Sequence, residues 1–277
     1  MINDIFPHQF NNQFIATKHI EESDYILHYS QNSLLLKQNG HGFELPRKKD
    51  VNEIYDTSAS TFLFTYDNVP CFLLWDDPKK VNGQLSYQES NLFRDFPQKE
   101  IAWVSIVGHQ MKNWYLENRY CGKCGSKTIE KPDERAIMCP HCNHLVFPKI
   151  SPAIIVAITC EDKILMAKNA NFRADWYSII AGYADVGESL EQTVVREVKE
   201  EVGLDITNLR YYKSQPWPVS GSMMIGFFAE ADCNQPIIID NKEITHAAWF
   251  TRGNLPNRPN NISIAGELID LFEKGEI

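Results

Sequence analysis

Short apolar and aromatic runs along the chain predict many strands and few helices. Near the N-terminus these runs lie at 25–30, 33–38, 61–66 and 71–75. Their shortness and apolar content are typical of β-strands. From about residue 98 to 117 the apolar positions recur at helical spacing instead, which predicts a helix. We therefore expect an N-terminal α+β domain, with a supporting or dimerising role.

The second half of the chain combines apolar runs with helical segments. Strands are expected at 152–159, 163–168 and 223–232, with a loop at 169–177 and a final helix at about 264–274. This order of strands and helices is typical of a sheet covered by helices on both faces. The sequence thus predicts an α+β protein whose C-terminal part is an α/β/α sandwich.

A further helix is expected from about Leu190 to Val202, because both of its ends carry specific signals. Ser189 followed by Gln192 is a capping-box pattern, and Gly203 suits the left-handed residue that follows a helix. At about 100° per residue the apolar side chains share one arc. Its members are Leu190, Val194, Val195, Val198 and Val202.

Four acidic side chains lie around this helix and its entry loop. Glu197, Glu200 and Glu201 stand beside the apolar arc, and Glu188 precedes the helix. Carboxylates three or four residues apart repel one another by roughly a few tenths of a kcal/mol per pair. A divalent cation would remove that cost, and oxygen ligands suit Mg²⁺ or Mn²⁺ better than zinc. Arg196 can hold a neighbouring carboxylate. The alternative is a surface helix with ordinary salt bridges, which the complete spacing disfavours.

Four cysteines form two Cys-x2-Cys pairs separated by fourteen residues. Such pairs are typical of zinc sites, and four thiolates leave no open position, so the zinc would be structural. The four are Cys121, Cys124, Cys139 and Cys142. Two disulfides are the alternative, which the odd total of seven cysteines and the absence of a leader disfavour. We expect Cys71, Cys160 and Cys233 to be core residues.

Charge and hydropathy narrow the choice of partners. The formal net charge of −9 disfavours a broad phosphate-binding surface, although residues 112–149 carry seven Lys and Arg against four Asp and Glu. The simpler interpretation of that surplus is ordinary surface charge. No apolar run approaches the roughly 20 residues that span a bilayer, so we expect a cytoplasmic protein without a membrane partner.

Three motifs occur in an order that resembles the Nudix hydrolases. Residues 182–204 match every fixed position of the Nudix box. The cysteine pairs, together with SQPWPVSGSMM at 214–224, are similar to the bacterial NADH pyrophosphatase branch, which also removes NAD caps from RNA. The resemblance implies a Nudix sandwich at 151–277 and a four-cysteine zinc ribbon at 112–150. It also implies that the N-terminal domain, 1–111, is a degenerate relative of the catalytic one.

The resemblance further implies a homodimeric, metal-dependent hydrolase of NADH or NAD that yields NMN(H) and AMP. The implied catalytic residues are Glu188, Arg196, Glu197, Glu200 and Glu201. The implied ligands of Mg²⁺ or Mn²⁺ are Glu197, Glu200, Glu201, Glu243 and the carbonyl of Ala181. Glu200 could equally accept a proton from water. The implied substrate contacts are Glu134, Phe147, Tyr183, Gln215, Pro216, Trp217, Pro218, Val219, Ser220, Gly221, Ser222 and Ala265.

The region that would hold the substrate departs from this branch. Val219 and Ser220 stand where Phe-Pro is usual, and Phe147 stands where relatives often have Tyr. A sugar nucleotide or a diadenosine polyphosphate therefore stays an alternative substrate. Trp217 offers a flat face for stacking, or else it plugs the edge of the domain. A non-catalytic regulator that touches nucleic acid through the ribbon is a further alternative, but it would not need four acidic positions.

Overall fold

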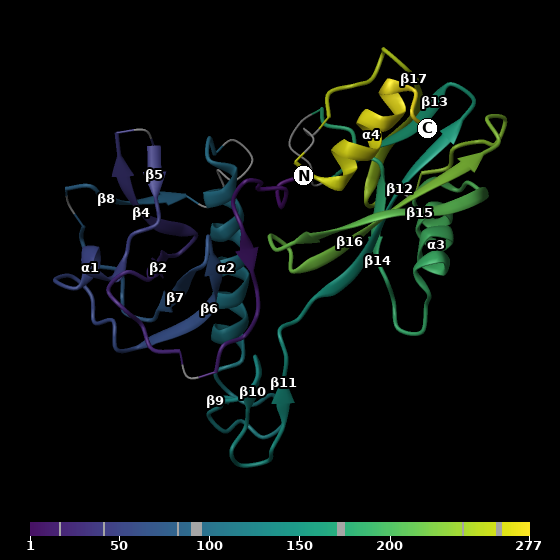
Figure 1. Cartoon of the computed structure of the whole chain (residues 1–277). Coiled ribbons are helices and arrows are strands. Elements are labelled where there is room, and N and C mark those ends of the chain that lie inside the picture. Colours follow the sequence, from purple (N-terminus) through teal and green to yellow (C-terminus); the bar gives the residue numbers. More distant parts are fainter. Residues whose placement is uncertain are drawn as a thin grey trace. The chain divides into compact units, whose positions relative to one another are not determined.

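The computed structural model describes all residues except 17, 41, 82, 90–95, 171–174, 240 and 259–261. The loop expected at 169–177 therefore lies partly outside the described residues. The chain forms two compact units (Figure 1). The first contains Ile2–Lys149 and Pro218–Ser220, and the second contains Met1, Ile150–Trp217 and Gly221–Ile277. No helix among the described residues is long and apolar enough to cross a membrane.

The N-terminal part of the first unit contains two four-stranded sheets and the short helix α1 (Lys48–Val51). The first sheet has the order β1-β6-β7-β2, with β1 (Phe10–Asn11), β6 (Ser60–Tyr66), β7 (Val69–Leu74) and β2 (Tyr25–Leu27). In the second, β4 (Ser33–Asn39) pairs with β3 (Tyr29–Ser30), β5 (Gly42–Glu44) and β8 (Leu85–Glu89). The four predicted strand regions are confirmed, but the run at 25–30 is divided between the two sheets.

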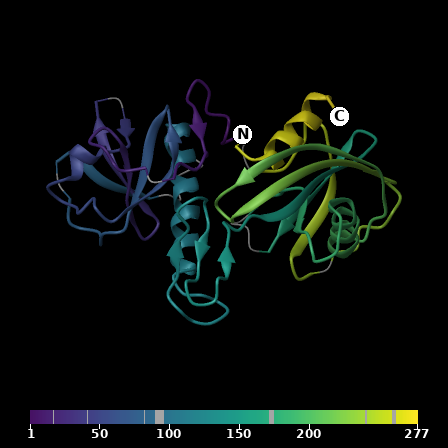
Figure 2. The ribbon, with the colours of Figure 1, turned by 60° about the horizontal axis from the view of Figure 1, so that its bottom comes forward.

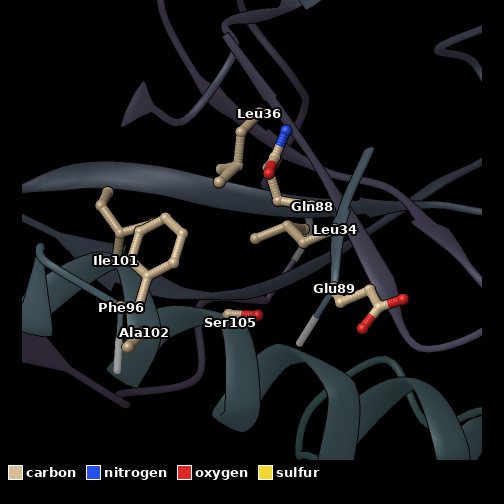
Figure 3. Close-up of a pocket in the computed structure, with 8 residues that line it drawn as sticks. All are labelled: Leu34, Leu36, Gln88, Glu89, Phe96, Ile101, Ala102 and Ser105. Carbon is tan, nitrogen blue, oxygen red and sulfur yellow. The ribbon is translucent and has the colours of Figure 1, made fainter. Parts of the chain in front are cut away.

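Helix α2 (Lys99–Glu117) confirms the helix predicted for this region. Residues 101–108 are buried without interruption, so this part of α2 lies inside the unit. At Gly108 an added Cβ would fall 2.4 Å from the hydroxyl of Tyr29, which donates a hydrogen bond to the carbonyl of Ser105 at 2.8 Å. A cavity of about 20 Å³, room for one water molecule, lies between α2 and strands β4 and β8 (Figure 3).

The chain after α2 forms a small ribbon within the first unit. Its antiparallel sheet has the order β11-β10-β9 and consists of β9 (Ile129–Glu130), β10 (Ile137–Met138) and β11 (Leu145–Val146). Figure 2 shows these short strands beside the carboxyl end of α2. Strands this short cannot hold a fold by themselves, so the ribbon depends on its cysteines.

The second unit is built on one six-stranded sheet of order β15-β16-β12-β13-β17, with β14 beside β12. Its strands are β12 (Ser151–Cys160), β13 (Lys163–Asn169), β14 (Ile180–Tyr183), β15 (Ile206–Trp217), β16 (Ser222–Ala231) and β17 (Ile244–Thr251). Helices α3 (Leu190–Val202) and α4 (Ile264–Lys274) cover opposite faces (Figure 1). Alternation along β12 supplies both cores: Ile154, Val156 and Ile158 pack on the α3 side, and Ile155 and Ala157 on the α4 side. The predicted sandwich and both helix ranges are confirmed.

The residues implied as substrate contacts at 215–222 do not form a single loop. Gln215, Pro216 and Trp217 end strand β15, and Ser222 begins β16, so only a turn at 218–221 lies between them. Strand β15 lies at the edge of the sheet, and many of its residues are polar and exposed. It therefore contains no apolar run from which a strand could be predicted. A proline is tolerated in such an edge strand.

Two apolar positions have surroundings that the sequence did not predict. Val195 stands at the margin of the apolar arc of α3 and is 52% exposed. Cys160 is buried, as expected, but it forms a disulfide with Cys233 at a Cα–Cα distance of 5.6 Å. The parallel pairing of β12 with β16 brings these two strand ends together across 73 positions of sequence. Cys71 is a buried free thiol, as predicted.

Candidate functional site

The ends of α3 are fixed by the predicted caps. The N–H of Gln192 donates to Oγ of Ser189 at 3.2 Å, and the N–H of Ser189 donates to Oε1 of Gln192 at 2.8 Å. The helix ends at Gly203, whose φ of 73° is left-handed. With both ends fixed, the turns of the helix place Glu197 beside β14 and leave Glu201 only 7% exposed.

The carboxylate of Glu197 lies against the backbone of Gly182 in β14. A Cβ at position 182 would fall 2.0–2.5 Å from three atoms of that carboxyl group, so glycine makes the close approach available. Burial raises the pKa of Glu197, and the nearby negative charges of Glu200 and Glu243 act in the same direction. Glu243, distant in sequence, is thus near enough for its charge to act on Glu197.

Arg196 binds three of the four acidic side chains of the box. Its Nε and Nη2 donate to the two carboxylate oxygens of Glu188 at 2.6 and 2.9 Å. Its Nη1 donates to Glu197 at 2.8 Å and to Glu200 at 3.0 Å, and Nη2 also donates to the carbonyl of Tyr183 at 3.0 Å. The bonds from Arg196 lower the pKa of Glu188 to about 2. The planar guanidinium group of arginine carries several N–H donors and can bind all of these acceptors at once, which a lysine could not do.

Thr193 is a member of the site that the sequence pattern did not single out. Its hydroxyl lies 3.0 Å from the carboxylate of Glu188 and 3.0 Å from the carbonyl of Ser189, and the residue is fully buried. It therefore helps to fix the carboxylate oxygen of Glu188 that also accepts from Nη2 of Arg196. In the sequence, the only signal for this role was that Thr193 places a hydroxyl next to the apolar residues of α3.

The donor set of this cluster fits a hard divalent cation. Glu197, Glu201 and Glu243 offer only oxygen atoms, which Mg²⁺ and Mn²⁺ prefer. Ala181 precedes Gly182 in β14, at the same strand end. The side chain of Glu200 is 61% exposed. Among the described residues, only the four cysteines bring three or more ligand atoms within 4.8 Å of one another. The carboxylate oxygens of the acidic cluster are therefore further from one another than the ligand atoms of the cysteine site.

The four cysteines of the ribbon form a site of the size that zinc requires. All four Sγ atoms lie within 4.8 Å of one another. Sγ of Cys121 lies 3.6 Å from Sγ of Cys142, and Sγ of Cys124 lies 3.5 Å from Sγ of Cys139. Zinc–sulfur bonds of about 2.3 Å in a tetrahedron place the sulfur atoms about 3.8 Å apart. The observed distances match that arrangement and are far too long for disulfides.

Two equivalent turns present these cysteines. The N–H of Gly125 donates to the carbonyl of Cys121 at 2.8 Å, and the N–H of Asn143 donates to the carbonyl of Cys139 at 2.9 Å. Gly125 and Asn143 both have a positive φ, of 74° and 56°. In the first turn the N–H of Lys123 also donates to Sγ of Cys121 at 3.4 Å. The two turns thus orient all four cysteines toward one shared site.

Two aromatic residues flank the acidic cluster in the second unit. Tyr183 ends β14 and is 53% exposed, and its hydroxyl lies 3.1 Å from Oγ of Ser222. Ser222 pairs with Trp217 across the β15–β16 hairpin. Since Arg196 binds the carbonyl of Tyr183, the acidic cluster and this aromatic pair share one end of the sheet.

Gln215 and Ala265 are more deeply placed than substrate contacts need to be. The Nε2 of Gln215 donates to the carbonyl of Ile262 at 3.1 Å, and its Oε1 accepts from the N–H of Ile264 at 2.7 Å. Gln215 is fully buried and holds the start of α4. Ala265 is 6% exposed in the first turn of α4, so its backbone alone could reach a ligand.

The remaining predicted contacts lie in the first unit or in the hairpin turn. Glu134 forms an ion pair with Lys131 at 3.0 Å, and Phe147, which follows β11, is 54% exposed. Residues Pro218–Ser220 belong to the first unit, and Val219 is 51% exposed. Gly221 closes the turn with a φ of 66°.

Three family models match the chain one after another. They are the NADH pyrophosphatase-like rudimentary NUDIX domain at 23–114, the NADH pyrophosphatase zinc ribbon domain at 116–147 and the NUDIX domain at 149–272. The NAD-capped RNA hydrolase NudC of Pseudomonas aeruginosa is 36% identical over 239 residues, which are 85% of this chain and 84% of that protein. NudC of Escherichia coli O1:K1 is 42% identical over 163 residues, or 59% of this chain and 63% of that protein.

A solved structure of a NUDIX hydrolase from Nitrosomonas europaea is also similar, with a TM-score of 0.49 and 18% identity over 56% of this chain and 90% of that one. The matches to the zinc ribbon and to both NUDIX-type domains agree with the order of motifs in the sequence. The chain belongs to the Nudix hydrolases, in the branch that carries the NADH pyrophosphatase zinc ribbon.

Proposed function

We propose that this chain is a hydrolase that cleaves the diphosphate of NADH or NAD into NMN(H) and AMP, and that it removes NAD caps from RNA. The observation that carries the proposal is the acidic cluster of α3 and β14, with Glu197 seated on Gly182 and held by Arg196. The names of the relatives and the matching zinc ribbon support the substrate. The domains that we propose are 1–111, the ribbon at 112–150 and the catalytic domain at 151–277.

The acidic cluster would hold Mg²⁺ or Mn²⁺, with Glu197 and Glu201 as first ligands and Glu200, Glu243 and the carbonyl of Ala181 completing the set. A bound ion would neutralise the diphosphate and lower the pKa of the attacking water. The sulfur ligands of the ribbon would hold one structural zinc.

The residues of this chain then orient the reactants. Arg196 and Glu188 form a pair that keeps Glu197 and Glu200 at fixed positions. Among Glu197, Glu200 and Glu201, Glu200 is the most exposed, which suits it to accept a proton from water or to complete the metal shell. The rings of Tyr183 and Trp217 offer faces on which nicotinamide or adenine can stack.

Isosteric variants of the first ligands test this proposal. We expect Glu197→Gln and Glu201→Gln each to lose most of the turnover of NADH in excess Mg²⁺ or Mn²⁺, because each removes a charge without removing volume. Glu191→Gln, an exposed position on the same helix, is the matched control and should retain activity. Turnover near that of the parent in both ligand variants would refute the metal assignment.

The second candidate function is hydrolysis of another nucleoside diphosphate derivative, either a sugar nucleotide or a diadenosine polyphosphate. It is favoured by the exposed Val219 and its neighbour Ser220, which stand where an aromatic wall would be expected. A non-catalytic regulator is disfavoured, because it would have no use for the intact acidic cluster.

We also propose, on the basis of the family resemblance, that the protein is a cytoplasmic homodimer. Sedimentation of the purified protein tests the dimeric state.

A further inference from the structure

A cavity of about 520 Å³ lies within the first unit, away from the four cysteines. It opens where the carboxyl end of α2 meets the ribbon strand β9, which Figure 1 shows next to each other. Its size falls within the range of about 300 to 1,000 Å³ that is usual for ligand sites. The residues used below are Trp75, Tyr115, Arg119, Tyr120, Lys127 and Glu130.

Aromatic rings form part of this cavity. The indole of Trp75 is fixed, because its Nε1 donates to Oγ1 of Thr61 at 2.9 Å and its ring meets that of Tyr115 edge-on at 5.7 Å. Tyr120 is 67% exposed, so much of its ring is accessible to a ligand. One rigid ring and one accessible ring are suited to a flat ligand.

The charges around the cavity favour an anion. Arg119 and Lys127 are both exposed, and neither forms an ion pair with any described residue. Glu130 is the acidic residue among those that line the cavity, and it accepts a hydrogen bond from Oγ1 of Thr61 at 2.8 Å. The cavity therefore combines two available cations with flat apolar faces.

We infer that this cavity binds one nucleotide of a single-stranded RNA, with the base against Tyr120 and the phosphate between Arg119 and Lys127. Stacking on a ring accepts any base, and the two cations would replace counterions of the backbone. The inference rests on the proposed function in one respect, since NAD-capped RNA brings such a strand to the protein. It assigns the surplus positive charge at 112–149 to RNA instead of to solubility.

Binding of a short, uncapped, single-stranded oligoribonucleotide tests the inference in the full-length protein. Fluorescence anisotropy without added divalent metal, and without chelators that would remove zinc, measures binding apart from hydrolysis. We expect Tyr120→Ala to weaken binding by roughly 5- to 150-fold and Tyr120→Phe to retain it. The double variant Arg119→Ala/Lys127→Ala should reduce the slope of log K against log salt by about 1.4. The double variant Lys49→Ala/Lys80→Ala, at exposed lysines of the same unit, is the matched control.

NADH turnover should be unchanged in all of these variants, which also shows that they are folded. Binding and salt slope equal to the parent in both cavity variants would overturn the inference. An equal loss of RNA binding in the Lys49→Ala/Lys80→Ala control would also overturn the inference, because the total charge of the protein would then explain binding. If AMP bound the cavity as tightly as the oligonucleotide, a free nucleotide would be the ligand and the RNA assignment would be wrong. Failure to cleave NAD-capped RNA would count against the proposed function alone.

Discussion

A single glycine decides where the central carboxylate of the site can lie. Replacing Gly182 with Ala would place a Cβ 2.0–2.5 Å from the carboxyl atoms of Glu197. The end of a flexible side chain can swing aside, so we expect the fold to survive while Glu197 leaves its position. NADH turnover should fall by about tenfold or more, since a misplacement of about 1 Å can cost about a hundredfold.

The matched control for that substitution is Gly40→Ala, where an added Cβ meets no atom within 4 Å. Its turnover and unfolding midpoint should equal those of the parent. Full activity of Gly182→Ala would show that the position of Glu197 observed here is not the working one.

The pair formed by Glu188 and Arg196 predicts a pH dependence of stability. The bonds from Arg196 lower the pKa of Glu188 from 4.5 to about 2 in the folded state. A lowered folded pKa means that the pair stabilises the protein above the unfolded pKa and loses this effect as the pH falls toward 2. Urea unfolding of the parent and of Glu188→Gln at pH 7 should therefore differ, and the difference should shrink below pH 4.5. A difference that is constant with pH would contradict this role.

The local sequence predicts α3 and α4 well because their limits depend on neighbouring residues. Ser189 and Gln192 fix the start of α3, and Gly203 and Gly275 end the two helices in left-handed conformations. Strand β15 escaped prediction because an edge strand needs no apolar run, and its order in the sheet is set by partners elsewhere in the chain. The turn at 218–221 could be located only once β15 and β16 were known to pair.

The ribbon has too little core to fold without its metal. We expect one zinc per purified chain, and we expect Cys139→Ser, at a fully buried ligand, to lose that zinc. Metal analysis and circular dichroism of both proteins measure the effect, with Cys71→Ser as the control for loss of a buried cysteine outside the site. Absence of zinc together with oxidised thiols in the parent would overturn the site.

At the scale of the whole molecule, the sequence predicts the residues of the acidic box but not the contacts that complete it. Glu188, Glu197, Glu200 and Glu201 share one segment, so their spacing alone indicates a site. Three features depend on tertiary pairing that no local pattern contains: the charge of Glu243 near Glu197, the anchoring of α4 by Gln215, and the Cys160–Cys233 disulfide. The family resemblance supplied Glu243, which the structure brings close to Glu197.

The most direct measurement is product analysis on a panel of diphosphates with Mg²⁺ or Mn²⁺ present. The panel contains NADH, NAD, NAD-capped RNA, a sugar nucleotide and a diadenosine polyphosphate, and each reaction is followed by chromatography and mass spectrometry. We expect NMNH and AMP from NADH, with a higher kcat/KM for NADH or NAD-capped RNA than for the other two classes. Intact NADH, with rapid cleavage of the sugar nucleotide or the diadenosine polyphosphate, would contradict the proposed function.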